Sequence, residues 1–369
     1  MKTSSTLSCA RWSGSLGAAS LSLLAGLAVG QTGWSALGGG LGNTAFNRGE
    51  VYAITDFGGL PTYGGWFTRA GGESASNVAR WTGTAWQPIG GGVNAFSGPT
   101  LGSHGEVIAL AVFQGQLYAG GAFTKYGTAT VRRLAKWNGT NWVEVGGGLN
   151  LALNTTDASR VRALTVHDDG TGPALYVGGN FNNIPGSPNI VKWDGVTLSG
   201  VGGGLPHHVY ALAEHASTTG VALFAGGAFN LGGSRVARWN GAGWSGVAGT
   251  SGGPNDIVYA LAEFQDSTGA ALYAGGKFTT VGITPVNRIA RWTGTAWQAL
   301  PGPASPGLGS GATDAVYSLA QQTGASGCGN SLVVGGKFNH SAPSLTNIAR
   351  WTGTQWIPLE AGGSDIVYA

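Results

Sequence analysis

Six copies of one residue pattern constrain the fold of this chain more than any other feature. Each copy begins with Gly-Gly-x-Phe and continues with a basic residue and a tryptophan, and five copies carry a second tryptophan five positions later. The mean spacing of about 54 residues is typical of the blades of a β-propeller and too long for a leucine-rich repeat. The first tryptophans are Trp81, Trp137, Trp193, Trp239, Trp292 and Trp351.

Each copy is predicted to hold four short strands, and the second copy shows them best. Its first strand, 107–113, is an almost continuous apolar run, as in strands buried on both faces. Shorter strands follow at 116–120, 131–137 and 141–145, and Asn138-Gly139 is a strong signal for a tight hairpin. The sequence therefore predicts an all-β fold, a β-propeller of four-stranded antiparallel blades. Its repeat units comprise residues 51–92, 107–148, 161–204, 209–249, 258–300 and 316–360.

The number of blades depends on two partial strands outside these six units. Residues 34–40 match the end of a unit, and residues 366–369 match the beginning of a first strand. Propellers close by hiding the edges of their outer strands, and two fragments make a poor blade. We expect six complete blades, with a seventh, partial blade shared between both segments as the alternative. The chain as a fragment of a longer repeat protein also stays open.

The first thirty residues have the pattern of a secretory signal peptide. A basic start is followed by an apolar stretch over residues 16–29 and by the small residues Ala28-Val29-Gly30. The apolar stretch is short for a bilayer span, although an uncleaved membrane anchor is an alternative. We therefore expect a signal peptide at 1–30 and a single secreted domain at 31–369, extracellular or on the cell surface, without a membrane span.

Charge is sparse, at 9% of residues, where soluble domains have roughly 25%. Cleavage of the signal peptide would lower the formal net charge from +3 to +1. A chain so close to neutral has no electrostatic basis for binding nucleic acid. Cleavage would also leave Cys328 as the sole cysteine, so we expect stability to come from packing and not from an internal disulfide.

The diglycine that ends the second strand and the aromatic residues on the third and fourth strands resemble the kelch motif. The form L-Y-x-G-G-x-F followed by I-A-x-W-x-G-x-x-W is closer still to repeats of secreted bacterial proteins, and similar to the ectodomain of fungal cell-polarity marker proteins. The resemblance covers residues 34–369 and implies a propeller, but no ligand. The copper site of galactose oxidase, a kelch enzyme, is not expected, because Cys328 has no tyrosine beside it.

One polar group precedes the first strand of each unit, where propeller loops open around a central channel. Converging carboxylates and imidazoles at this channel mouth could bind a ligand or a cation, either calcium or another divalent metal. The alternative is that these are ordinary turn residues, since no local metal-ligand spacing is present. The candidate residues are Glu50, Glu106, His207, His208, Asp256 and Asp314, with Arg160 at the third unit.

Tryptophans at fixed strand positions are predicted to pack between blades, because each buries roughly 150–250 Å². Trp66 differs, since it occupies the variable position of its Gly-Gly-x-Phe. We therefore single out Trp66 and Tyr63 as a candidate sugar-stacking pair. The basic residue before each tryptophan is expected to point outward and to cover the ring with its alkyl stem.

No catalytic signature is present: the sequence has no G-x-S-x-G elbow, H-E-x-x-H or P-loop lysine. The sequence favours a secreted, non-catalytic propeller that acts as a binding or interaction scaffold for an extracellular protein or polysaccharide. A carbohydrate-binding, lectin-like propeller is the first alternative. A hydrolase or lyase with its site at the channel mouth is the second.

Overall fold

The computed structural model describes residues 37, 39–42, 49–93, 105–149, 159–182, 184–217, 220–250, 252–266, 269–301, 307–309, 311–322, 330–341, 344–359 and 366–369. The predicted signal peptide and Cys328 lie outside these residues. The described part of the chain contains strands and turns and no helix, so the all-β prediction is confirmed. It accordingly offers no helix that is long and apolar enough to cross a membrane.

Six four-stranded antiparallel sheets correspond to the six predicted repeat units. The first three sheets are β2 (Glu50–Phe57), β3 (Leu60–Trp66), β6 (Val78–Trp81), β7 (Trp86–Pro88); β8 (Val107–Phe113), β9 (Gln116–Gly121), β12 (Leu134–Trp137), β13 (Trp142–Glu144); and β14 (Arg160–Asp168), β15 (Pro173–Asn180), β16 (Ile190–Trp193), β17 (Leu198–Gly200). The others are β18 (Val209–Ser217), β19 (Gly220–Leu231), β20 (Ser234–Trp239), β21 (Trp244–Gly246); β22 (Val258–Asp266), β23 (Gly269–Gly276), β26 (Ile289–Trp292), β27 (Trp297–Ala299); and β28 (Ala315–Gln322), β29 (Ser331–Ser341), β30 (Ser344–Trp351), β31 (Trp356–Pro358).

Short additional strands decorate three of these sheets, and all of them except β1 lie between the second and third strands of the sheet. They are β1 (Leu41–Gly42) with β4 (Arg69–Ala70) and β5 (Glu73–Ser74), β10 (Lys125–Tyr126) with β11 (Ala129–Thr130), and β24 (Thr280–Val281) with β25 (Thr284–Pro285). The partial strands predicted at 34–40 and 366–369 are not strands at their described positions.

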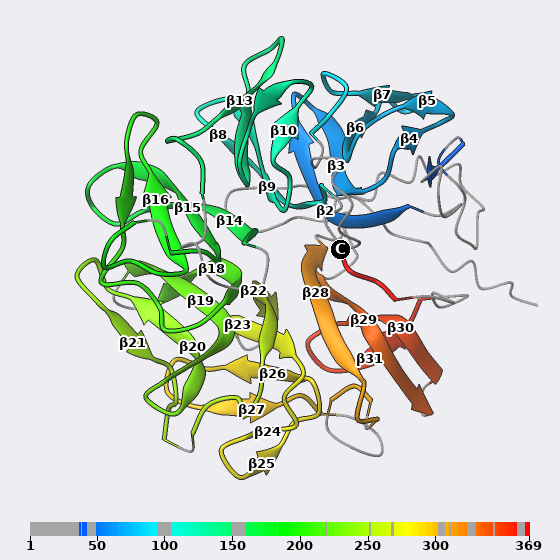
Figure 1. Ribbon diagram of the computed structural model, residues 1–369. Coiled ribbons are helices and arrows are strands. Elements are labelled where there is room, and N and C mark those ends of the chain that lie inside the picture. Colours follow the sequence, from blue (N-terminus) through cyan, green and yellow to red (C-terminus); the bar gives the residue numbers. More distant parts are fainter. Residues whose placement is uncertain are drawn as a thin grey trace, which may run out of the picture.

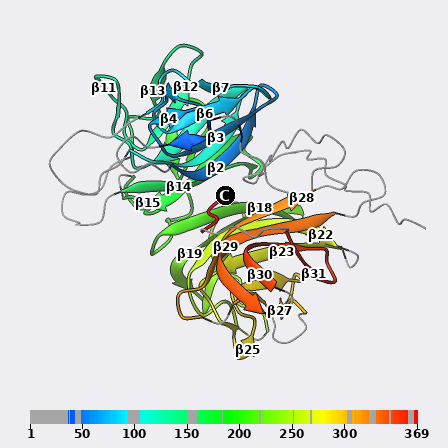
Figure 2. The same cartoon turned by 90° about the vertical axis from the view of Figure 1, so that its right-hand side faces the viewer.

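The six sheets lie around a common centre, and the first strand of each sheet faces it (Figure 1). Each first strand packs beside the first strand of the next sheet, in the order β2, β8, β14, β18, β22, β28. In the view turned by 90°, the sheets of the N-terminal half lie above the centre and those of the C-terminal half below it (Figure 2). Residues near the start of every first strand therefore approach one another, although they are far apart in sequence.

The hydrophobic core lies between consecutive sheets. One cluster joins Val78 and Ile89 of the first sheet to Leu117 and Trp142 of the second, and equivalent clusters join the later pairs. The third-strand and fourth-strand tryptophans of one sheet lie opposite each other, with ring centroids 5.1–5.7 Å apart. The predicted role of the repeated tryptophans in packing is confirmed.

The two glycines of each Gly-Gly-x-Phe are required for different steric reasons. A Cβ on the first glycine would meet a valine of the next first strand, as Gly275 would meet Val316 Cγ1 at 2.4 Å. A Cβ on the second glycine would meet a backbone carbonyl of its own sheet, as Gly276 would meet the oxygen of Ile257 at 2.1 Å. The first glycine therefore permits the sheets to approach, and the second permits the irregular pairing of the first two strands.

Two segments outside the six sheets repeat contacts that neighbouring sheets make. Val367 lies against Gly335 as Val316 lies against Gly275, with its Cγ1 2.6 Å from where a glycine Cβ would be. The indole nitrogen of Trp86 donates to the carbonyl of Leu37 at 2.7 Å. Equivalent tryptophans donate to the end of the preceding sheet, for instance Trp142 to Ile89 at 3.0 Å. Residues 37 and 366–369 thus lie between the sixth sheet and the first.

Candidate functional site

Every first strand carries a β-bulge near its beginning. In β22, for example, Val258 pairs with Gly276 and Ala260 pairs with Gly275, which leaves Tyr259 without a partner in the register. A bulge of this kind redirects the side chain of the extra residue. The bulge residues of the six sheets are Tyr52, Ile108, Arg162, Tyr210, Tyr259 and Tyr317.

The bulge residues and Tyr368 form a ring around the common centre, which we call the central ring. Tyrosine contacts continue from sheet to sheet, with centroid distances of 5.1 Å for Tyr210–Tyr259 and 5.2 Å for Tyr259–Tyr317. Tyr368 connects the last sheet to the first, since it lies 5.3 Å from Tyr317 and 5.4 Å from Tyr52. All these side chains are half-buried. The central ring thus presents aromatic surface that strand pairing does not use.

Arg162 occupies the ring position before Tyr210 and packs on it. Its guanidinium carbon lies 4.7 Å from the centroid of the Tyr210 ring, a cation–π arrangement. Ile108 is the bulge residue of the second sheet and so comes between Tyr52 and Arg162 in the order of the sheets. The central ring therefore consists of five phenols, one aliphatic side chain and one guanidinium.

Three phenols of the ring, those of Tyr52, Tyr259 and Tyr317, stay protonated near neutral pH. Burial raises the pKa of Tyr317 and raises the pKa of Tyr259 to about 12. Burial, together with a hydrogen bond to Glu50, also raises the pKa of Tyr52. The ring can therefore donate hydrogen bonds and offer π faces, but these phenols do not exchange protons near pH 7 as an acid or base catalyst must.

Two predicted channel-mouth carboxylates have partners beside the ring. The Tyr52 hydroxyl donates to Glu50, and Arg160 forms an ion pair with Glu106 at 2.7 Å. After burial, both carboxylates contribute to the raised pKa of Tyr52, as negative charges near a phenol do. The prediction that residues from different units meet there is supported by these contacts.

The other channel-mouth candidates make local contacts. His207 and His208 stack with centroids 4.3 Å apart, and His208 reaches Tyr210 at 6.2 Å. Asp256 accepts a bond from the adjacent Ile257 amide, and Asp314 accepts one from the Gly311 amide, as turn residues do. Within the described ranges, no three His, Cys, Asp or Glu side chains are grouped so that they could hold a metal ion.

The two candidate sugar-stacking residues have different surroundings. Tyr63 is 4% exposed and packs edge-on against Trp86 with centroids 4.9 Å apart, which does not fit a stacking role. It is buried because its strand, β3, is the second strand of its sheet and has neighbours on both sides. Trp66 ends that strand, is half-buried, and pairs in register with Glu50. Trp66 therefore lies beside the central ring.

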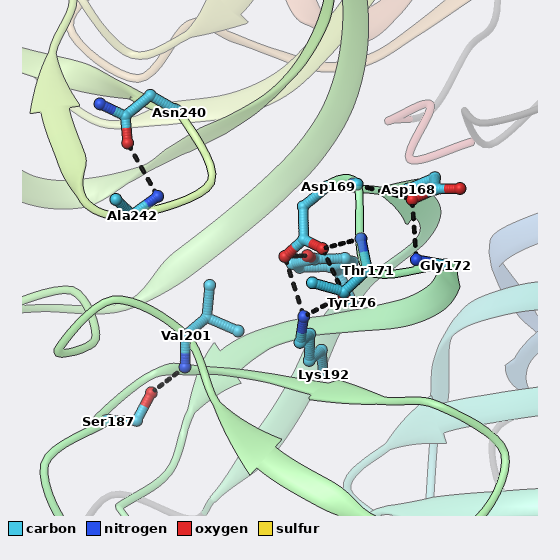
Figure 3. A network of polar contacts seen from close by, with 11 residues as sticks. Asp168, Asp169, Thr171, Gly172, Tyr176, Ser187, Lys192, Val201, Asn240 and Ala242 are labelled. Carbon is cyan, nitrogen blue, oxygen red and sulfur yellow. Dashed lines mark hydrogen bonds and ion pairs between the residues drawn. The ribbon is translucent and has the colours of Figure 1, made fainter.

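Two of the basic residues before the repeated tryptophans, Lys192 and Arg291, pair with carboxylates of their own sheets. Lys192 donates to the carboxylate of Asp169 at 2.8 Å and to the hydroxyl of Thr171 at 3.1 Å (Figure 3). Tyr176 also donates to Asp169, at 2.7 Å. Burial raises the pKa of the Asp169 carboxyl, but the hydrogen bonds from Lys192, Thr171 and Tyr176 outweigh it and hold that pKa well below its usual range.

The same arrangement recurs two sheets later. Arg291 pairs with Asp266 at 3.5 Å, and Tyr273 donates to Asp266 at 2.9 Å. These groups join the hairpin of the first two strands to the third strand. The cation–π contact was expected with the following tryptophan, but Lys192 lies over a tyrosine of the second strand, 5.9 Å from the centroid of Tyr176.

Two buried histidines link consecutive sheets at the far end of the first strands. His167 contacts Glu214, and His215 contacts Glu263, each at 2.7 Å. The side chains of His167 and His215 are 3% and 6% exposed. Phe57, Phe113 and Phe264 hold the equivalent position in other sheets, so these pairs replace an apolar contact and belong to packing.

The central ring was not predicted from the sequence. The available signal was the dipeptide Val-Tyr, which opens four of the first strands and recurs at Val367-Tyr368. An alternating strand would direct such a tyrosine to a sheet face, and periodicity alone does not reveal the bulge that redirects it.

No protein-family model and no curated protein matches this sequence. Among solved structures, one match is the extracellular domain of BT4673 from B. thetaiotaomicron, described as a hybrid two-component system. It is 12% identical with a TM-score of 0.47, over 86% of this chain and 34% of that one. A second structure of that extracellular domain, described as a one-component system, is 13% identical with a TM-score of 0.43, over 86% and 39%. The chain spans little more than a third of the length of these matches.

Proposed function

We propose that this protein is a secreted, non-catalytic binding protein whose ligand, an extracellular protein or polysaccharide, docks at the central ring. The proposal depends on the repeated bulge. In each sheet the bulge directs one side chain toward the common centre, although strand pairing does not require this. Five of the seven ring positions are tyrosines, which are enriched where proteins bind ligands.

We further propose that the six sheets are blades of a β-propeller with seven positions. Residues 37 and 366–369 would occupy the seventh. The equivalence of Val367 with Val316, each seated against the first glycine of the preceding sheet, supports this arrangement. Val367→Asp should then lower the melting temperature about as much as Val316→Asp does. A melting temperature unchanged by Val367→Asp would contradict the seventh position.

The absence of catalysis follows from the chemistry of the ring. General acid–base catalysis needs groups that titrate near the working pH, and burial moves the pKa of the Tyr259 and Tyr317 phenols upward, away from it. The carboxylates nearest the ring are engaged, Glu50 by Tyr52 and Glu106 by Arg160. We therefore expect a binding surface that leaves its ligand unchanged and that needs no cofactor.

The proposal is tested by a binding screen of the purified protein on polysaccharide and glycan arrays and on purified extracellular proteins. Each ligand found is measured again with Tyr259→Leu and with Tyr126→Leu, a matched tyrosine in β10 outside the ring. Loss of binding in the first variant alone supports the central ring. Equal binding by both variants would refute it.

The same screen is repeated with calcium and with a chelator. We expect no difference, because Asp256 and Asp314 are held in local turn contacts. Binding that disappears with chelator would favour the metal-assisted site at the channel mouth. A carbohydrate ligand lost with Trp66→Ala but kept with Tyr259→Leu would favour the lectin-like alternative, which rests on the half-buried Trp66.

A further inference from the structure

We propose that the central ring recognises an organic cation, a quaternary ammonium or guanidinium group carried by the ligand. This inference rests on the proposed function, since it names the chemistry of the same site. Aromatic side chains attract cations through the negative faces of their rings, and cages of several aromatic residues are a known solution for ammonium groups that cannot donate hydrogen bonds.

The first support is that the ring already holds one guanidinium of this chain. Arg162 lies 4.7 Å from the Tyr210 centroid, although the strand positions around it are apolar. Arg162 is therefore an internal example of the ligand chemistry. It also shows that a planar cation fits against a ring tyrosine at this depth.

The second support is the size of the ring. Tyrosine centroids follow one another at 5.1–5.4 Å. Seven positions spaced evenly at that distance lie on a circle with a radius of about 6 Å, which is the reach of a cation–π contact. A cation on the axis would thus be within reach of Tyr52, Tyr259, Tyr317 and Tyr368, while Arg162 covers a face of Tyr210. A sugar ring, by contrast, stacks on one or two aromatic faces.

The third support is the charge around the entrance. The negative charges of Glu50 and Glu106 act on Tyr52, and that of Asp256 acts on Tyr259, so these carboxylates lie close to the ring. Arg160 pairs with Glu106, Glu50 accepts a hydrogen bond from Tyr52, and Asp256 accepts one from the Ile257 amide. Arg162 carries a positive charge, which opposes a bound cation. Its removal should therefore strengthen the binding of a cation.

The test uses choline and its neutral isostere 3,3-dimethylbutan-1-ol, titrated by calorimetry into the folded protein. Choline should bind with a dissociation constant of about 1 mM or tighter, and the isostere at least tenfold more weakly. Equal affinity for both would overturn the inference, because only the charge distinguishes them.

Ring variants separate π contacts from hydrogen bonds. Tyr259→Phe keeps the aromatic face and should bind choline within about twofold of the natural protein, whereas Tyr259→Leu should bind roughly fivefold more weakly. Ile108→Tyr adds a sixth phenol at a position where four other sheets carry tyrosine, and it should bind choline more tightly. It also keeps the inference testable if Tyr259→Leu fails to fold. Loss of binding in Tyr259→Phe would point to hydroxyl recognition and against a cation.

Arg162→Gln decides the sign of the ligand charge. Removing the internal cation should strengthen choline binding by about fivefold, since it vacates the Tyr210 face and removes a repulsion. Weaker choline binding in this variant would mean that Arg162 assists binding instead of repelling the cation, and it would overturn the inference. If choline fails while an array ligand still depends on Tyr259, only the cation chemistry is wrong. If Tyr259→Leu changes the binding of no ligand, the proposed function fails as well.

Discussion

Gly276→Ala tests whether the bulge that carries the central ring depends on the second glycine. The new Cβ would lie 2.1 Å from the carbonyl oxygen of Ile257 and 3.0 Å from Phe278, which is fully buried. Nonbonded carbon and oxygen atoms do not approach closer than about 3 Å, so the carbonyl must move by about 1 Å. That carbonyl accepts a hydrogen bond from the Lys277 amide at 2.8 Å, and the movement would break it.

The magnitude follows from these two effects. A buried backbone group left without its partner costs about 1–3 kcal/mol. Displacing the first strand within a packed core costs about 1–3 kcal/mol more. We therefore expect Gly276→Ala to lower the free energy of unfolding by about 2–6 kcal/mol. For a chain of this size the melting temperature should fall by roughly 5–20 °C.

Gly243→Ala is the matched control, because Gly243 has no atom within 4 Å of an added Cβ and does not have a positive φ. It should change the free energy of unfolding by less than about 0.5 kcal/mol. Calorimetry and thermal melts followed by tryptophan fluorescence measure both variants. A Gly276→Ala protein that melts within about 2 °C of Gly243→Ala would refute the steric explanation of the diglycine.

Four further variants test the packing between and within sheets. Glu263→Ala should destabilise by about 1–3 kcal/mol because it leaves the buried His215 without its partner, whereas His215→Phe should be tolerated, since Phe occupies this position in other sheets. Asp169→Asn should destabilise by about 2–3 kcal/mol at pH 7, because the charge-assisted bond from Lys192 is lost. Trp142→Phe should cost about 1–3 kcal/mol through its lost bond and the space it leaves.

Denaturant titrations over a pH series check these expectations. The Asp169 carboxyl has a lowered pKa in the folded protein, so its contribution is present above the unfolded-state pKa of about 4 and is lost as the pH falls further. Asp169→Asn should therefore show a flatter acid limb than the natural protein. An unchanged acid limb, a His215→Phe protein as unstable as Glu263→Ala, or a neutral Trp142→Phe would each contradict the contact concerned.

Much of the fold was readable from local patterns. The Asn138-Gly139 hairpin, the four strands of each unit and the tryptophan pairs depend on neighbours within about 50 residues, so one repeat contains their physical cause. The second unit was predicted to have a third strand at 131–137, and the observed strand begins at Leu134. The difference arises because Arg133 has a positive φ and donates to the carbonyls of Ala122 and Phe123, which holds the preceding residues out of the strand.

The candidate site was only partly readable. Glu50 and Glu106 were predicted at the centre, and their contacts with Tyr52 and Arg160 agree with that position. Tyr63 is buried against Trp86 because the packing of neighbouring strands, and not residue type, decides which aromatic side chain reaches solvent.

Repetition in the sequence was enough to specify the strands, their order within each sheet and the residues that pack between sheets, because each repeat solves the same local packing problem. The central ring was decided by the assembled molecule. Its members lie about 50 residues apart along the chain, and they meet because each sheet has a bulge at the same place and the sheets surround one centre (Figure 1). Such a convergence depends on the placement of whole sheets, which no single repeat encodes.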